Sequence, residues 1–306
     1  MEKYHQVSKG INFPNNNFYG KYVTQEQLDA DYDVEKAVSD FPDYIKEYTR
    51  NSEEARRILK NKTVIAYGPT LMERLTVYPA KESGAPVFIF IHGGYWKIGL
   101  GDDYDFVAMG ASNANFTVVI VNYELAPKVN IPEMVRQIRS SIGWTSQNIS
   151  KFNGDPERIF VGGHSAGGHL AAMTATTNWS DYGLPKNTVK GILAVSGLFD
   201  LEPVSRTFVQ PAIRITADQI LSSSPIRLIV SSKIPLIAAW GAQETEAFIT
   251  QSSDYLEAWK NAGNKGNALI ISEANHFSIL REFMTEDGLL TKAVIALENE
   301  NRTTIL

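Results

Sequence analysis

The sequence predicts an α/β fold in which a mostly parallel, twisted sheet carries helices on both faces. From residue 87 onward, short and fully apolar runs alternate with segments of helical periodicity, which is typical of strands buried between two layers of helices. A glycine-rich turn also joins one such run to an Ala-rich segment at 166–177. The expected strands are residues 87–91, 116–121, 158–162, 191–196, 234–240 and 268–272, and the expected helices between or after them include 132–152, 245–262 and 289–297.

Two further regions differ from this alternation. Residues 1–62 are charged and helical in pattern over 24–60, with too few apolar positions for a core of their own, so we expect a helical N-terminal extension packed on a catalytic domain at 63–306. That domain should begin with an antiparallel pair at 63–67 and 71–78, divided by Gly68-Pro69. Residues 201–233 contain three prolines and are too long for a simple connection, which favours a small cap insertion over the sheet.

Composition narrows the function classes. The chain has 306 residues, 43% hydrophobic and 21% charged, as in globular proteins, and its net charge of -5 gives no basic footprint for nucleic acid. It contains no cysteine, which excludes disulfides, thiolate metal sites and a cysteine nucleophile. No apolar run reaches the roughly 18 residues of a membrane span, and residues 1–10 lack the apolar core of a signal peptide, so cytoplasmic residence is expected. We expect a small-molecule substrate and no metal or cofactor. The sequence leaves open whether the chain forms a homodimer.

The segment Gly163-His164-Ser165-Ala166-Gly167 is the strongest candidate for catalytic chemistry. It follows an apolar run and precedes a helical one, which is the strand, turn and helix context that places a serine on a sharp, exposed turn. Ser165 is therefore a candidate nucleophile. The alternative is an ordinary glycine-rich turn, including one that holds a phosphate.

A serine nucleophile needs a base and an acid that orients it. His276 follows the last expected strand and is the candidate base, although a surface or core histidine is the alternative. The expected chain order is serine, acid, histidine. We favour Glu244 as the acid, since it follows the preceding strand, with Glu246 and Asp200 as rivals.

The run His92-Gly93-Gly94-Tyr95-Trp96 follows another strand and offers backbone donors for an oxyanion. We expect the N–H groups of Gly93, Gly94 and Ala166 to form the oxyanion hole. Tyr95 and Trp96 are candidate substrate-binding residues, although aromatic side chains there could equally belong to the core.

These motifs carry a family resemblance. Together with Asn122-Tyr-Glu-Leu-Ala-Pro127, Gly197-Leu-Phe-Asp200 and Asn275-His-Phe277, they resemble the kynurenine formamidase (arylformamidase) branch of the α/β-hydrolases and, more distantly, the hormone-sensitive-lipase-like esterases. The likeness extends from about residue 63 to the end. The matching acid position usually holds Asp in the family and holds Glu244 here, and Tyr95 stands where the lipase-like branch has a third glycine.

The resemblance implies a serine hydrolase that acts on a small amide or ester, with an N-formyl arylamine such as N-formylkynurenine as the first expectation. A carboxylesterase for short-chain or aryl esters is one alternative, and an amide hydrolase for another nitrogen compound is a second. A non-catalytic ligand-binding protein on the same fold is the alternative from a different class.

Overall fold

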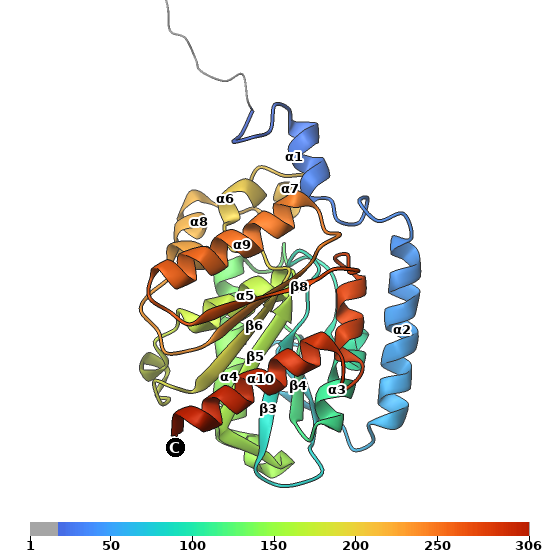
Figure 1. The fold of residues 1–306 in the computed structure, drawn as a ribbon, viewed down its shortest axis with the longest axis vertical. Coiled ribbons are helices and arrows are strands. Elements are labelled where there is room, and N and C mark those ends of the chain that lie inside the picture. Colours follow the sequence, from blue (N-terminus) through green and yellow to red (C-terminus); the bar gives the residue numbers. More distant parts are fainter. Residues whose placement is uncertain (1–17, 306) are drawn as a thin grey trace, which may run out of the picture.

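The computed structural model describes residues 18–305, so the polar segment at 1–10 lies outside the described residues. The centre of the fold is an eight-stranded sheet with the order β1-β2-β4-β3-β5-β6-β7-β8 (Figure 1). The strands are β1 (Thr63–Ala66), β2 (Arg74–Tyr78), β3 (Ala85–Ile91), β4 (Thr117–Val121), β5 (Gly154–His164), β6 (Val189–Val195), β7 (Leu236–Gly241) and β8 (Gly266–Ile271).

The pairing of the strands confirms the predicted mostly parallel sheet. Strands β1 and β2 form the expected antiparallel pair, and β2 also runs antiparallel to β4, whereas all pairs from β4 through β3 to β8 are parallel. Every residue of β3 and β4 is buried, whereas the edge strands β1 and β8 are partly exposed. The fully apolar runs in the sequence therefore correspond to the middle of the sheet, where helices cover both faces.

Helices form most of the segments that connect the strands along the chain. Helices α3 and α10 contact each other on one face of the sheet, α4 and α5 contact each other on the opposite face, and α9 packs on β7 and β8 (Figure 1). The longer helices are α1 (Gln25–Tyr32), α2 (Phe41–Ile58), α4 (Ile131–Asn148), α5 (Ala166–Ala175), α9 (Glu246–Asn261) and α10 (Leu289–Ile305). The shorter ones are η1 (Gly101–Val107), α3 (Ala108–Asn113), η2 (Ile149–Phe152), η3 (Trp179–Tyr182), α6 (Leu201–Val204), α7 (Gln210–Ile213), α8 (Ala217–Ser223), η4 (Pro225–Arg227) and η5 (Ser278–Phe283).

Helix α2 shows how local sequence places an element. Pro42 suits its first turn, and the buried residues Tyr44, Tyr48, Ser52 and Ala55 recur every three or four positions to form one stripe. The rest of the helix surface is mainly charged and faces solvent. As a result α2 lies along the outside of the molecule with this stripe against the main body (Figure 1).

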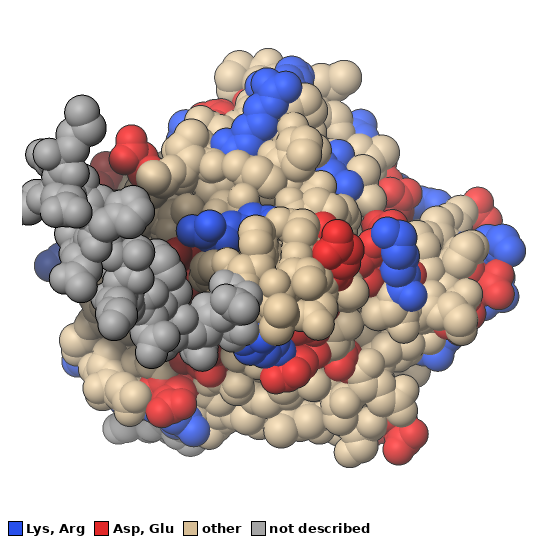
Figure 2. All heavy atoms as spheres, turned by 90° about the horizontal axis from the view of Figure 1, so that it is seen from above, with Lys and Arg blue, Asp and Glu red and all other residues tan. Residues whose placement is uncertain are grey.

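The segment expected to be a cap contains the short helices α6, α7, α8 and η4, and lies at the top of Figure 1 beside α1. Two hydrogen bonds join it to α1. Gln25 Nε2 donates to the carbonyl of Arg206 at 2.7 Å, and the N–H of Phe208 donates to Asp29 Oδ1 at 2.6 Å. Figure 2 shows acidic and basic side chains interspersed over the described part of this upper face. None of the helices within 18–305 combines the length and hydropathy that a bilayer span requires.

Candidate active site

The residues singled out from the sequence meet at the carboxyl edge of the sheet. Ser165 follows β5, Glu244 follows β7 and His276 follows β8. Ser165 has φ 57° and ψ -121°, a backbone conformation that costs a non-glycine residue about 1–3 kcal/mol and that must be held by its surroundings. The N–H of Ser165 donates a hydrogen bond to the carbonyl of Val195 at 2.9 Å, which helps to keep the residue in this conformation.

Two glycines make this sharp turn possible. A Cβ added at Gly163 would lie 2.2 Å from the carbonyl oxygen of Gly167, and a Cβ at Gly167 would lie 2.0 Å from the carbonyl oxygen of Ile91. Both obstacles are backbone atoms of the central sheet and helix, which have little room to move. The turn therefore requires glycine on each side of Ser165.

The carboxylate of Glu244 contacts the imidazole of His276. Its Oε2 lies 2.7 Å from His276 Nδ1, while its Oε1 accepts hydrogen bonds from Ser196 Oγ at 2.6 Å and from the N–H of Gly241 at 2.7 Å. The Glu244 side chain has no exposed surface. These hydrogen bonds compensate for burying the carboxylate and fix its direction.

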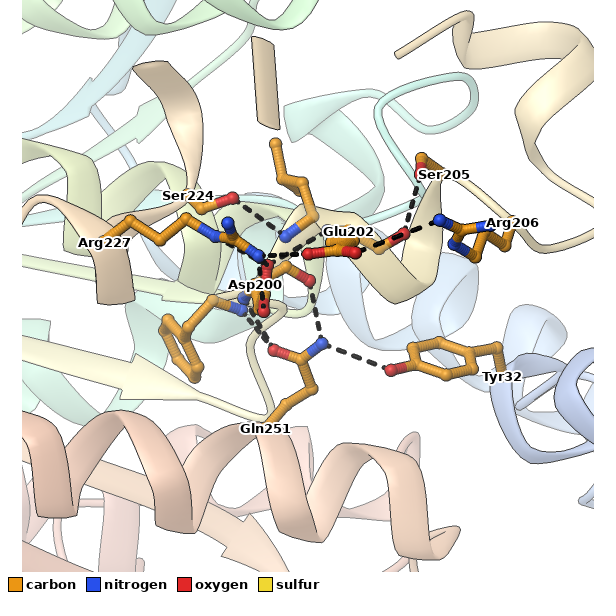
Figure 3. Close-up of polar contacts among 10 residues, drawn as sticks. Tyr32, Asp200, Glu202, Ser205, Arg206, Ser224, Arg227 and Gln251 are labelled. Atoms are coloured by element: carbon orange, nitrogen blue, oxygen red, sulfur yellow. Dashed lines mark hydrogen bonds and ion pairs between the residues drawn. The ribbon is translucent and has the colours of Figure 1, made fainter. Parts of the chain in front are cut away.

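The two rival carboxylates are engaged elsewhere. Glu246 is 72% exposed and forms an ion pair with Lys21. Asp200 forms an ion pair with Arg227 at 3.1 Å and accepts the N–H of Glu202 at 3.0 Å, which caps α6 (Figure 3). Of the three acids considered from sequence, Glu244 is the one that the structure brings to His276.

The glycine loop after β3 lies against the serine turn. A Cβ added at Gly93 would be 3.0 Å from the Cβ of Ser165, and Gly94 has φ 104°, which favours glycine. Ala166 is the first residue of α5, so its N–H has no acceptor within the helix. The three backbone groups expected to bind an oxyanion are thus grouped around the turn that carries Ser165.

A pocket of about 260 Å³ opens in front of these residues, lined by Ser165, His276 and Tyr95 among others. Besides Tyr95, its walls include the aromatic residues Phe41, Tyr48, Tyr104 and Phe277. Trp96 is not among the lining residues: its ring is fully buried and lies edge-on to His169, with the ring centroids 5.1 Å apart. The structure therefore brings Tyr95 to the pocket and leaves Trp96 in the core, which is the alternative that the sequence left open.

Three further histidines among the described residues are buried. Burial lowers the pKa of His92 and of His169 from the usual 6.5 to about 4, and burial together with the neighbouring His276 lowers the pKa of His164 well below 6.5. All three are therefore neutral at pH 7. His164 Nε2 lies 2.8 Å from the carbonyl oxygen of His276, and since a carbonyl only accepts, this nitrogen carries the proton.

Sequence reasoning missed several residues of this site. Ser196 holds the Glu244 carboxylate, and its place at the carboxyl end of the expected strand 191–196 was the available signal. Phe41 and Tyr48 come from the N-terminal extension, whose contribution to the pocket has no motif in the sequence. Among residues 18–305, no group of three His, Cys, Asp or Glu side chains is arranged to hold a metal ion.

Comparison with known proteins identifies the family. The BD-FAE family model matches residues 75–259. The chain is 34% identical over 254 residues to the kynurenine formamidase of Danio rerio, which covers 80% of this chain and 85% of that protein. It is 27% identical over 224 residues to the esterase LipC of Mycobacterium tuberculosis, covering 66% of this chain and 55% of that protein. The esterase of Pyrobaculum calidifontis shares the fold, with a TM-score of 0.70 at 22% identity over 92% of this chain and 97% of that one. The chain is therefore a hydrolase that belongs to the kynurenine formamidase-like branch of the α/β-hydrolase superfamily.

Proposed function

We propose that this chain is a serine hydrolase that removes the formyl group from an N-formyl arylamine such as N-formylkynurenine. The observation that carries the proposal is the pair formed by Glu244 and His276, whose imidazole lines the same pocket as Ser165. A serine on a strained turn, an imidazole and a carboxylate held by its own hydrogen bonds are the parts that acyl transfer requires. The relationship to the Danio rerio kynurenine formamidase supports the choice of substrate.

In the first half of the reaction, Ser165 Oγ attacks the formyl carbon and its proton passes to His276 Nε2. The carbonyl oxygen becomes an oxyanion, which accepts hydrogen bonds from the N–H groups of Gly93, Gly94 and Ala166. When the intermediate collapses, the C–N bond breaks and His276 returns the proton to the departing arylamine nitrogen. The product is a formyl ester on Ser165.

Water completes the cycle. His276 takes a proton from a water molecule, whose oxygen attacks the formyl ester, and the second tetrahedral intermediate releases formate and restores the hydroxyl of Ser165. Throughout, Glu244 keeps Nδ1 of His276 protonated and stabilises the imidazolium that forms. The aromatic walls of the pocket fit the aryl part of the substrate, because planar rings pack well against such surfaces.

The direct test is the Ser165→Ala variant. Loss of the nucleophile should lower kcat for N-formylkynurenine by several orders of magnitude, on the order of 10⁴ or more, while the unfolding transition stays close to that of the unchanged protein. A fluorophosphonate probe should label the unchanged protein at Ser165 and leave the variant unlabelled. Near-normal hydrolysis by Ser165→Ala would contradict the mechanism, and an unlabelled wild-type serine would favour a ligand-binding protein.

A carboxylesterase is the second candidate, favoured by the likeness to the esterase LipC. It uses the same machinery, so only the substrate separates the two. We expect kcat/KM for N-formylkynurenine to exceed that for short-chain aryl esters, and the reverse order would favour the esterase. We also propose cytoplasmic residence, which the absence of cysteine fits.

A further inference from the structure

We propose that residues 25–58, here called the N-terminal strap, position the loops of the active site through the hydroxyl groups of Tyr48 and Tyr95. The proposal rests on the function proposed above. It assigns to the strap more than a wall of the pocket: the strap fixes where the base and the oxyanion donors lie. Tyr48 and Tyr95 are positioning residues, since each acts through the backbone of another segment.

The strap holds the loop of His276 on both sides. The hydroxyl of Tyr48, in α2, donates to the carbonyl of Phe277 at 2.7 Å in a buried contact, and Asn275 Nδ2 donates to the hydroxyl of Tyr44 at 3.0 Å. The ring of Phe277 also packs on Tyr44, with centroids 5.8 Å apart. The residues immediately before and after His276 are thus tied to one rigid helix.

The strap also holds the glycine loop. The buried hydroxyl of Tyr95 donates to the backbone carbonyl of Tyr32, the last residue of α1. Tyr95 has φ 49° and follows Gly94, so it sits in a strained turn directly beside the expected oxyanion donors. A strained turn keeps its conformation only where the surrounding structure fixes it, and this hydrogen bond supplies part of that constraint.

Tyr32 is itself well anchored. Its hydroxyl accepts a hydrogen bond from Gln251 Nε2 at 3.2 Å, and the same nitrogen donates to the carbonyl of Asp200 at 2.9 Å (Figure 3). The neighbouring Asp31 accepts the N–H of Ala247 at 3.1 Å, near the start of α9 and three residues after Glu244. The strap therefore contacts the segments that follow β3, β7 and β8, which carry the donors Gly93 and Gly94, the acid and the base.

Preorganisation explains why these contacts matter for rate. An oxyanion hole and a general base act only when they are already in place as charge develops, and a misplacement of about 1 Å can cost on the order of 10²-fold in rate. Without the hydroxyl, the carbonyl of Phe277 keeps only the N–H of Leu280 at 3.2 Å and that of Tyr32 only the N–H of Val34 at 3.1 Å, both of them local contacts within a few residues. The hydrogen bond that ties each active-site loop to the strap is then lost, so the loop is expected to shift. That shift would move His276 in one case and Gly93 and Gly94 in the other.

The test compares Tyr48→Phe and Tyr95→Phe with Tyr67→Phe. The control removes the same kind of bond, because the Tyr67 hydroxyl donates to the carbonyl of Asn122 at 2.6 Å and Tyr67 is not among the lining residues of the pocket. We expect kcat to fall about 10-fold in Tyr48→Phe and in Tyr95→Phe, with a smaller change in KM, and to stay near wild type in the control. The affinity for an aryl boronic acid, which mimics the tetrahedral intermediate, should fall in step with kcat.

Two results would overturn the proposal. One is an unchanged kcat in both Tyr48→Phe and Tyr95→Phe, with a loss of stability equal to that of Tyr67→Phe, which would make the strap purely structural. The other is a rise in KM alone with unchanged boronic acid affinity, which would leave the strap as a pocket wall. Inactive Ser165→Ala together with either result would retain the proposed function and reject only the strap.

Discussion

Glu244 shows how one side chain can be assigned by its contacts. One carboxylate oxygen faces His276 and the other is held by Ser196 and the N–H of Gly241, so the carboxylate cannot rotate away without losing two hydrogen bonds. The nearby Glu246 has no such environment and pairs with an exposed lysine. Two acids only two positions apart therefore differ in burial, in partners and, on our proposal, in role.

The residue-scale prediction ranks three substitutions. Glu244→Ala should lower kcat by roughly 10³ to 10⁴-fold, because His276 loses the group that orients it and stabilises its charged form. Glu246→Ala should stay close to wild type, since an exposed ion pair contributes about 0–1 kcal/mol. Asp200→Ala should lower stability by about 1 kcal/mol through the lost cap of α6 while kcat is retained. Steady-state kinetics and urea unfolding of all three variants check this order. A larger loss of kcat in Glu246→Ala or Asp200→Ala than in Glu244→Ala would assign the role of the orienting acid to that residue instead.

The sequence narrowed the acid to three residues and favoured Glu244, but it could not exclude Glu246 or Asp200. Glu244 and Glu246 both follow β7, and the difference arises because α9 begins at Glu246 and turns that side chain toward solvent. Trp96 illustrates the same limit. Tyr95 and Trp96 are neighbours in a turn where both have positive φ, so one ring reaches the pocket and the other the core. Such directions depend on the conformation of the turn, which the residue types alone do not determine.

At the scale of elements, the turn between β5 and α5 depends on a close approach of backbone. We expect Gly163→Ala to destabilise the protein by about 1–3 kcal/mol or more and to lower kcat, since the added Cβ would lie 2.2 Å from the carbonyl oxygen of Gly167. Gly143→Ala is the control. That glycine lies in α4 with its nearest obstacle at 3.8 Å, so the change should stabilise by up to about 1 kcal/mol. Urea unfolding of both variants measures the difference, and equal effects would show that the turn can relax.

Strands were predicted best where they are buried on both faces. The apolar runs predicted most residues of β3, β4 and β6, because central strands of a parallel sheet consist almost entirely of apolar residues. The expected strand at 71–78 is too long at its start, since β2 begins at Arg74. The preceding Glu73 is buried in a turn and pairs with Arg136 of α4 at 2.6 Å. That partner is distant in the sequence, so the local pattern could not reveal where the strand begins.

At the scale of the whole molecule, buried neutral histidines make stability depend on pH. The folded-state pKa of His92 and of His169 is about 4, against 6.5 for an unperturbed imidazole, because both rings are fully buried. Between these values the unfolded chain binds more protons than the folded one. The stability that these two neutral histidines contribute is therefore fully present above about pH 6.5, and it is lost as the pH falls toward 4.

We predict that each of these histidines contributes about 2 kcal/mol to the loss of unfolding free energy between pH 7 and pH 5. Urea unfolding at the two pH values measures the loss, and His169→Gln isolates one contribution. The variant replaces the imidazole, whose Nε2 lies 2.7 Å from the carbonyl oxygen of Ser223, with an amide that can also donate but does not titrate. The variant is expected to be less stable at pH 7, because the ring also packs on Trp96, but its loss between pH 7 and pH 5 should be smaller by about 2 kcal/mol. An identical pH dependence in the two proteins would mean that His169 is protonated in the folded state at pH 5.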